Sequence, residues 1–227
     1  MSQNRKSFWA GVRSEFPLLL AVFPFGMIYG VLALGAGLSA LAAQAMSSIV
    51  FAGSAQFITA KLVGDQAPGL VIVVTIAVVN LRHALYSASL APYLESASTG
   101  WKALLAYLLT DEAYAVTITH YDKQGATPSS HWYFLGAGLA LWTTWQTSTA
   151  VGIFLGATLP PDWPLDFALP LTFIALVIPA LKDRPAVAAA LSAGLVALAA
   201  YNLPYKLGLI VAALVGISIA TFLEGRK

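Results

Sequence analysis

The sequence predicts an all-α fold, a polytopic integral membrane helical bundle of seven to eight spans whose helices are interrupted by proline and glycine. The first reason is composition: 59% of the 227 residues are hydrophobic and only 10% are charged, whereas a soluble domain carries about 25% charged residues. The second reason is that the apolar residues form runs of about 20, the length that a helix needs to cross the hydrocarbon core. We therefore expect lipid to surround most of the chain.

Composition and motifs also disfavour several classes of protein. A net charge of +2 gives no reason to expect a nucleic-acid partner. The absence of cysteine excludes disulfides and thiolate metal sites. The sequence lacks HExxH, Walker A, GxSxG and EF-hand patterns, so we expect no enzyme, no catalytic residue, no metal and no cofactor. No polar stretch is long enough for a soluble domain, and residues 1–227 are predicted to form a single transmembrane domain.

Eight apolar runs are candidates for spans. The first follows Arg5, Lys6 and Arg13, as in a signal peptide, but it is longer than the usual apolar region of about 7–15 residues, so we interpret it as an uncleaved span. The second is rich in Ala, Ser and Gly and is alternatively re-entrant. The last two are separated only by Asn202–Pro204 and are alternatively one broken element, so the count stays at seven or eight. In chain order the runs are 16–37, 41–63, 68–91, 103–120, 132–157, 165–181, 186–203 and 205–223.

The basic residues indicate the orientation, because Lys and Arg prefer cytoplasmic loops. With eight spans and the N-terminus inside, nine basic residues fall on the cytoplasmic side and only Lys102 and Lys206 fall outside. We therefore expect both termini in the cytoplasm. The nine are Arg5, Lys6, Arg13, Lys61, Lys123, Lys182, Arg184, Arg226 and Lys227.

Proline and glycine are expected to break two of the spans. Pro24 and Gly26 lie in the first span, and Pro170 and Pro179 lie in the sixth. A proline removes a backbone donor and frees a carbonyl, which in lipid needs another partner. Each site is either a packing kink or a break that points backbone groups at a substrate.

Three polar clusters lie inside apolar runs, and the first contains Gly53, Ser54 and Gln56. Small residues allow a neighbouring backbone to come close, and an amide both donates and accepts hydrogen bonds. Two interpretations stay open. One is close helix packing with an interhelical hydrogen bond, and the other is contact with a substrate.

The second cluster contains Asn80, Arg82, His83 and Tyr86 in the third run. An arginine inside a span costs about 2.5–3.5 kcal/mol on insertion scales, so it is retained when it is paired or faces a polar cavity. Snorkelling to the interface is the alternative. We interpret Asn80, Arg82 and Tyr86 as candidates for substrate binding.

The third cluster contains Asp111 and Glu112 in the fourth run. Adjacent residues on a helix point about 100° apart, so the two carboxylates cannot both face lipid. Arg82 and Asp111 fall at similar depth on consecutive antiparallel spans, and we predict that Arg82 pairs with one of the two carboxylates. The pair is either structural, or it leaves a carboxyl group able to exchange a proton with His83 close by.

These segments, in this order, resemble the AzlC family of branched-chain amino acid exporters. The resemblance covers nearly the whole chain and is strongest at residues 50–57 and 80–86, with further matches at 24–30, 109–114 and 166–169. It implies efflux of leucine, isoleucine and valine, and in some members methionine, across a bacterial inner membrane. It also implies a small AzlD-type membrane subunit as partner and protons as the energy source.

The polar residues suit this class of substrate. A zwitterionic amino acid needs a cation or a helix N-terminus for its carboxylate and an acceptor for its ammonium group. Arg82 supplies the first, Asp111 or Glu112 supplies the second, and neighbouring apolar residues would surround the side chain. We therefore expect a transport domain that acts as a secondary transporter. The alternatives are a channel for a small polar solute and a non-transporting scaffold subunit whose buried charges bind a partner helix.

Overall fold

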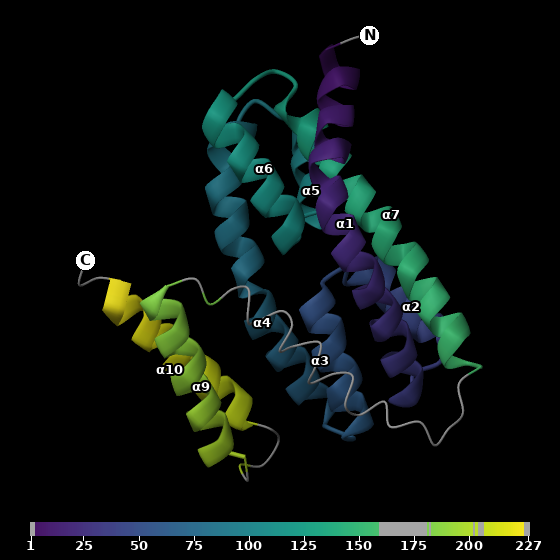
Figure 1. The fold of residues 1–227 in the computed structure, drawn as a ribbon, viewed down its shortest axis with the longest axis vertical. Helices are drawn as coiled ribbons and strands as arrows, with labels where there is room; N and C mark the ends of the chain where they lie inside the picture. Colours follow the sequence, from purple (N-terminus) through teal and green to yellow (C-terminus); the bar gives the residue numbers. More distant parts are fainter. Residues whose placement is uncertain (1–2, 159–180, 182, 202, 204–206, 225–227) are drawn as a thin grey trace. The chain divides into compact units, whose positions relative to one another are not determined.

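The computed structural model describes residues 3–158, 181, 183–201, 203 and 207–224, and every regular element in this part of the chain is helical (Figure 1). The predicted all-α class is therefore confirmed. Pro170 and Pro179, the two breaks expected in the sixth run, lie outside the described residues. In chain order the helices are α1 (Gln3–Gly35), α2 (Ala40–Ile49), α3 (Gly53–Gly64), α4 (Gly69–Leu90), the short 3₁₀ helix η1 (Ala91–Leu94), α5 (Thr99–Tyr107), α6 (Asp111–Gln124), α7 (Ser130–Gly156), α9 (Arg184–Ala199) and α10 (Leu207–Glu224).

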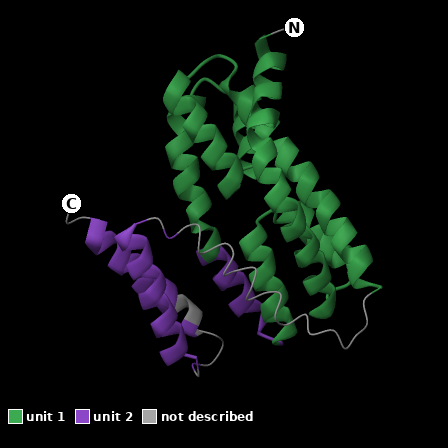
Figure 2. Ribbon diagram, viewed as in Figure 1, with its two compact units in different colours: residues 1–65, 79–163 green, residues 66–78, 164–227 purple. Residues whose placement is uncertain are grey.

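The chain divides into two compact units (Figure 2). Unit 1 contains Met1–Asp65 and Val79–Trp163, and unit 2 contains Gln66–Val78 and Pro164–Lys227. In unit 2 the last two predicted runs form separate helices, α9 and α10, which pack on each other through small residues. The single transport domain expected from the sequence stays a prediction.

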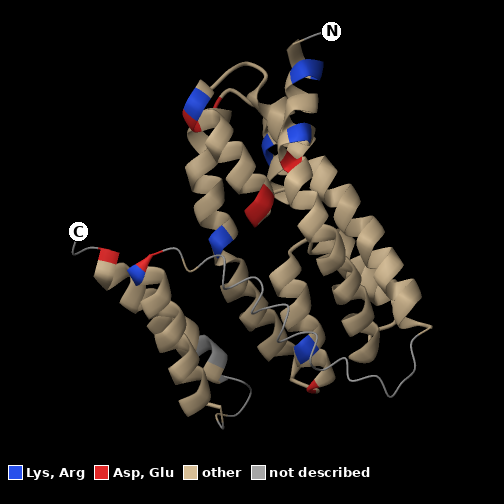
Figure 3. Cartoon of the chain, in the orientation of Figure 1, with Lys and Arg blue, Asp and Glu red and all other residues tan. Residues whose placement is uncertain are grey.

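Two described segments, α1 and Gly69–Leu94, are long and apolar enough to cross a membrane. The second and fourth predicted runs are each divided into two shorter helices, α2 with α3 and α5 with α6. Charged residues are sparse along these helices (Figure 3), and α7 has no Lys, Arg, Asp or Glu in its 27 residues. These properties fit a protein in a lipid bilayer, while the count of seven to eight spans stays a prediction.

Helices α1 and α7 form the main packing seam of unit 1 (Figure 1). A Cβ atom on Gly11 would overlap the backbone of Tyr133, and one on Gly152 would overlap the backbone of Met27. The partners of α1 glycines advance along α7 in the same order, so the two helices run parallel. Glycine lets the backbones approach closely, which is how helices associate in membranes without a hydrophobic driving force.

The expected break at Pro24 and Gly26 is wrong, because α1 is continuous through both residues and through Pro17. Both prolines lie on the exposed side of the helix, so their rings do not interfere with the seam. Gly26 is buried on the seam, where a Cβ atom would overlap the Ser148 hydroxyl. Packing against α7 offsets the loss of the backbone hydrogen bonds that the prolines remove.

The breaks lie instead at residues 50–52 and 108–110, where neither proline nor glycine is present. Phe51 at the first break has a φ of 42°, a conformation that is uncommon for a bulky residue. The carbonyls freed at the end of α2 have partners: the Tyr107 hydroxyl donates to Ser48 O, and Gln146 Nε2 donates to Ser47 O. Side chains from α5 and α7 thus satisfy the broken backbone, as a membrane interior requires.

Candidate functional site

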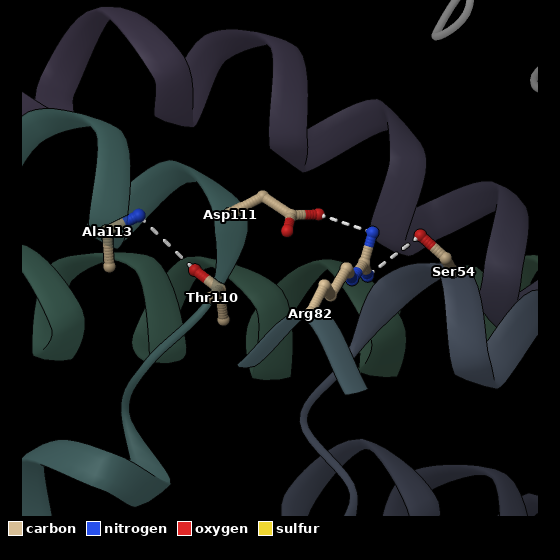
Figure 4. A network of polar contacts seen from close by, with 5 residues as sticks. All are labelled: Ser54, Arg82, Thr110, Asp111 and Ala113. Atoms are coloured by element: carbon tan, nitrogen blue, oxygen red, sulfur yellow. Dashed lines mark hydrogen bonds and ion pairs between the residues drawn. The ribbon is translucent and has the colours of Figure 1, made fainter. Parts of the chain in front are cut away.

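Arg82 on α4 joins three helices. Its Nη1 lies 2.8 Å from Asp111 Oδ2, and its Nη2 donates to Ser54 Oγ at 3.1 Å (Figure 4). The sequence predicted a pair between Arg82 and Asp111 or Glu112, and the structure places Asp111 on the guanidinium. We call Ser54, Arg82 and Asp111 the Arg82 cluster. Its role in transport stays a prediction.

Two half-helices begin at this cluster. Ser54 is the second residue of α3 and Asp111 is the first residue of α6. Thr110 caps α6, since its Oγ1 accepts from Ala113 N at 3.3 Å (Figure 4), and the acidic residues in the first turn complement the positive end of the helix dipole. The α3 terminus has no side-chain cap at Ala52. Its first backbone N–H groups therefore have no side-chain acceptor from the capping position.

The Arg82 cluster has unused hydrogen-bonding capacity. Asp111 Oδ1 and Arg82 Nε are shielded from solvent, yet they have no hydrogen-bond partner among the described residues. The two side chains are 38% and 30% exposed, so the ion pair is not sealed in the protein. Each member of the ion pair therefore keeps one unpaired group, a donor on Arg82 and an acceptor on Asp111, in a partly open site.

Two tyrosines extend the site along α4 and α6. The Tyr86 and Tyr114 rings stack with centroids 4.3 Å apart and an interplanar angle of 12°, and Tyr114 also hydrogen-bonds Ser89 at 3.0 Å. Tyr86 is one turn beyond Arg82 and Tyr114 one turn beyond Asp111, so helical spacing places both rings beside the ion pair. Of the predicted substrate residues, Ser54, Arg82 and Tyr86 are therefore brought together.

Gln56 and Gly53 face a different neighbour, α7. Gln56 is fully buried; its Nε2 donates to Ser47 Oγ at 2.9 Å, and its Oε1 accepts from Trp145 Nε1 at 3.0 Å. Ser47 Oγ in turn lies 2.8 Å from Thr149 Oγ1, and a Cβ atom on Gly53 would stand 3.2 Å from the Trp145 ring. The structure favours the interhelical hydrogen bond over a substrate contact for Gln56. We call Ser47, Gln56, Trp145 and Thr149 the Gln56 cluster.

The remaining predicted residues lie around the Arg82 cluster without a hydrogen bond to it. The His83 ring centroid is 6.1 Å from that of Tyr86. Asn80 is two residues before Arg82, so it points about 160° away around α4, and its shielded Oδ1 has no partner in the described part of the chain. Glu112 follows Asp111 in the first turn of α6 and is half-buried. Their assigned roles stay predictions.

Sequence reasoning missed Glu15, the one charged residue among the described positions that is completely buried. The first apolar run of the sequence begins at residue 16, whereas α1 begins at Gln3. Glu15 shares the buried face of α1 with Gly11, Val22 and Gly26. This spacing of four, seven and four residues is the signal that could have identified it.

Comparison with known proteins identifies the family. Residues 17–159 match the AzlC protein family, and this range contains both clusters. The chain is 33% identical over 214 residues to an uncharacterized membrane protein of Archaeoglobus fulgidus, with 92% of each chain covered. It is 25% identical over 206 residues to the inner membrane protein YgaZ of Escherichia coli, covering 87% of this chain and 84% of that one.

A third relative is the branched-chain amino acid transport protein AzlC of Bacillus subtilis, 29% identical over 182 residues, which cover 77% of this chain and 70% of the relative. No solved structure matches the chain. The family match over most of the chain, the membrane proteins among its relatives and the apolar helices agree: the chain is a membrane protein that belongs to the AzlC family.

Proposed function

We propose that the chain is a secondary transporter that exports leucine, isoleucine and valine, with methionine as a further substrate, across the cell inner membrane. The observation that carries this proposal is the partly open Arg82 cluster, where two half-helices begin beside an ion pair with an unused donor and an unused acceptor. Broken helices whose N-termini face a shared site are the usual binding architecture of secondary transporters. The name of the Bacillus subtilis relative supports the substrate class.

The proposed binding mode uses each free group once. The substrate carboxylate accepts from Arg82 Nε and from the uncapped N–H groups at the start of α3, whose dipole favours an anion. The substrate ammonium donates to Asp111 Oδ1. A zwitterion thereby contacts both members of the ion pair and requires no net change of charge in the site.

Proton coupling and the partner are further parts of the proposal. The adjacent carboxyl groups of Asp111 and Glu112 are candidates to carry a proton, because they occupy the first turn of the same short helix beside the proposed substrate site. A small AzlD-type subunit is the proposed partner, on the family resemblance. The excess of Lys and Arg in the expected cytoplasmic loops supports cytoplasmic termini.

The test is counterflow of labelled leucine in proteoliposomes, with and without the AzlD-type subunit. Unlabelled isoleucine and valine should compete. Leucinamide, which lacks the carboxylate, and 4-methylpentanoate, which lacks the ammonium group, should compete roughly 10- to 100-fold less well, because each leaves a charged hydrogen-bonding group unmatched.

Variants sharpen this test. Arg82→Gln should abolish counterflow, whereas the matched control Lys102→Gln, which removes an equal charge from an exposed residue of α5, should not. A leucine flux that does not saturate, together with an internal leucine concentration that never exceeds the outside concentration, would indicate a channel. Equal flux in Arg82→Gln and the wild type would contradict the proposed site.

A further inference from the structure

Glu15 is a buried carboxyl group whose charge is not balanced by a cation among the described residues. It is completely buried, and neither of its oxygens has a hydrogen-bond partner among the residues described by the structure. It lies on the α1 face that packs against α7, a helix with no Lys, Arg, Asp or Glu. An unpaired charge in such surroundings is strongly unfavourable, and a carboxylate avoids it by binding a proton.

The groups that face Glu15 do not supply a counter-charge. From α6, Glu112 is close enough for the two carboxyl groups to repel each other when both are charged. From α7, Tyr133 lies within electrostatic reach of Glu15. The His120 ring of α6 stacks on the Tyr133 ring with centroids 3.7 Å apart. The other two helices packed on α1 offer no cation: α2 has no titratable residue, and Lys61 of α3 pairs with Asp65.

The first turn of α6 links Glu15 to the substrate site. Asp111 contacts Arg82 on α4, while the next residue, Glu112, belongs to the helix that packs on α1 and lies within electrostatic reach of Glu15. Adjacent helical positions point about 100° apart, so a single short helix presents one carboxyl group to each neighbour. A shift of α6 would change the ion pair with Arg82 and the repulsion between Glu112 and Glu15 together, which is the requirement for coupling two ligands.

We propose that Glu15 and Glu112 form a proton-binding site of the transport cycle, distinct from the Arg82 cluster, with Glu15 carrying the proton in this structure. This inference rests on the proposed function and names the carrier of the coupled ion. Glu112, which is half-buried, gives and takes the proton between Glu15 and the partly open substrate site. Proton release leaves two neighbouring carboxylates, whose repulsion favours the movement of α6 that substrate binding completes.

The experiment compares two activities of the same proteoliposomes. Leucine counterflow at equal pH requires substrate movement only, whereas accumulation driven by an imposed pH difference requires coupled proton movement. With one proton per leucine, the wild type should accumulate leucine up to about tenfold for each pH unit, since a pH unit and a tenfold gradient are the same free energy. Glu15→Gln imitates the protonated carboxyl group in shape, so it should retain counterflow and show no accumulation.

Two further variants complete the design. Glu112→Gln should likewise retain leucine counterflow and show no accumulation driven by a pH difference. The control Glu95→Gln removes an exposed carboxyl group and should behave as the wild type does in both assays. The amount of folded protein is measured for each variant by size-exclusion chromatography.

Each contrary outcome has a defined meaning. Accumulation by Glu15→Gln at the wild-type level overturns the inference. So does failure of Glu15→Gln to fold, because a neutral amide must be accepted where a neutral carboxyl group is proposed. Loss of counterflow together with accumulation would place Glu15 in substrate binding and also overturn it. A wild type without leucine counterflow instead contradicts the proposed function, and the proton site falls with it.

Discussion

Two polar clusters use opposite sides of α3, and they differ in how completely their hydrogen bonds are made. In the Gln56 cluster all four side chains are buried, and both ends of the Gln56 amide are engaged. In the Arg82 cluster the ion pair is about one-third exposed and retains a free donor and a free acceptor. A polar residue inside an apolar helix therefore does not by itself indicate a substrate site. A satisfied cluster holds helices together, whereas an incompletely satisfied one can receive a ligand.

The largest expected effect comes from disrupting the Arg82 cluster. Arg82→Gln strands the Asp111 carboxylate, which costs about 3 kcal/mol on insertion scales, and should reduce both the folded yield and leucine transport. The double variant Arg82→Gln, Asp111→Asn has no stranded charge, so its folded yield should recover while transport stays absent. Yield and efflux are measured together. Recovery of transport in the double variant would show that the pair is only structural.

The Gln56 cluster should respond in the opposite way. Gln56→Leu leaves the Trp145 indole N–H and the Ser47 hydroxyl without their partner, which should destabilise the protein by about 1–3 kcal/mol. Transport per folded molecule should be retained. Thermal unfolding in detergent and counterflow provide the two readouts, with Thr59→Val as control because Thr59 bonds only within its own helix. A stable Gln56→Leu protein that has lost transport would break the comparison and return Gln56 to the substrate site.

The smallest expected effect is that of Ser54→Ala. It removes one hydrogen bond to Arg82, worth about 1 kcal/mol, so the half-saturating leucine concentration should rise roughly fivefold. Thermal stability should fall by less than in Gln56→Leu, because Arg82 keeps Asp111. The exposed serine Ser87 on α4 provides the control Ser87→Ala. A loss of stability as large as that of Gln56→Leu would show that the two clusters do not differ in kind.

The sequence predicted the pairing of helices better than their interruptions. Arg82 and Asp111 could be matched because the depth of a residue in a span follows from its distance along the run, and consecutive spans are antiparallel. The breaks could not be located, because Phe51 and Leu109 carry no local signal. The break at residues 50–52 depends on partners from distant segments, Tyr107 and Gln146, which satisfy carbonyls freed at the end of α2.

The other differences between the sequence-based expectations and the structure have two causes: the direction in which side chains point around a helix, and the residue at which a helix begins. Ser54 and Gln56 are two residues apart, so they point about 160° from each other, and only the position of α3 relative to α4 and α7 decides which of them meets Arg82. Glu15 was hidden because a helix can begin well before its apolar run does. Pro24 marks no break, since contacts along the α1–α7 seam outweigh its local preference.

Leucine-dependent thermal stability is the most direct test that the Arg82 cluster, and not the Gln56 cluster, receives the substrate. A ligand that binds the folded protein stabilises it, by about 2.7 kcal/mol at 100 times its dissociation constant. Saturating leucine should therefore raise the unfolding temperature of the wild type and of Gln56→Leu, and should not change that of Arg82→Gln, Asp111→Asn. An equal rise in the double variant and the wild type, or a rise that only Gln56→Leu abolishes, would contradict the account.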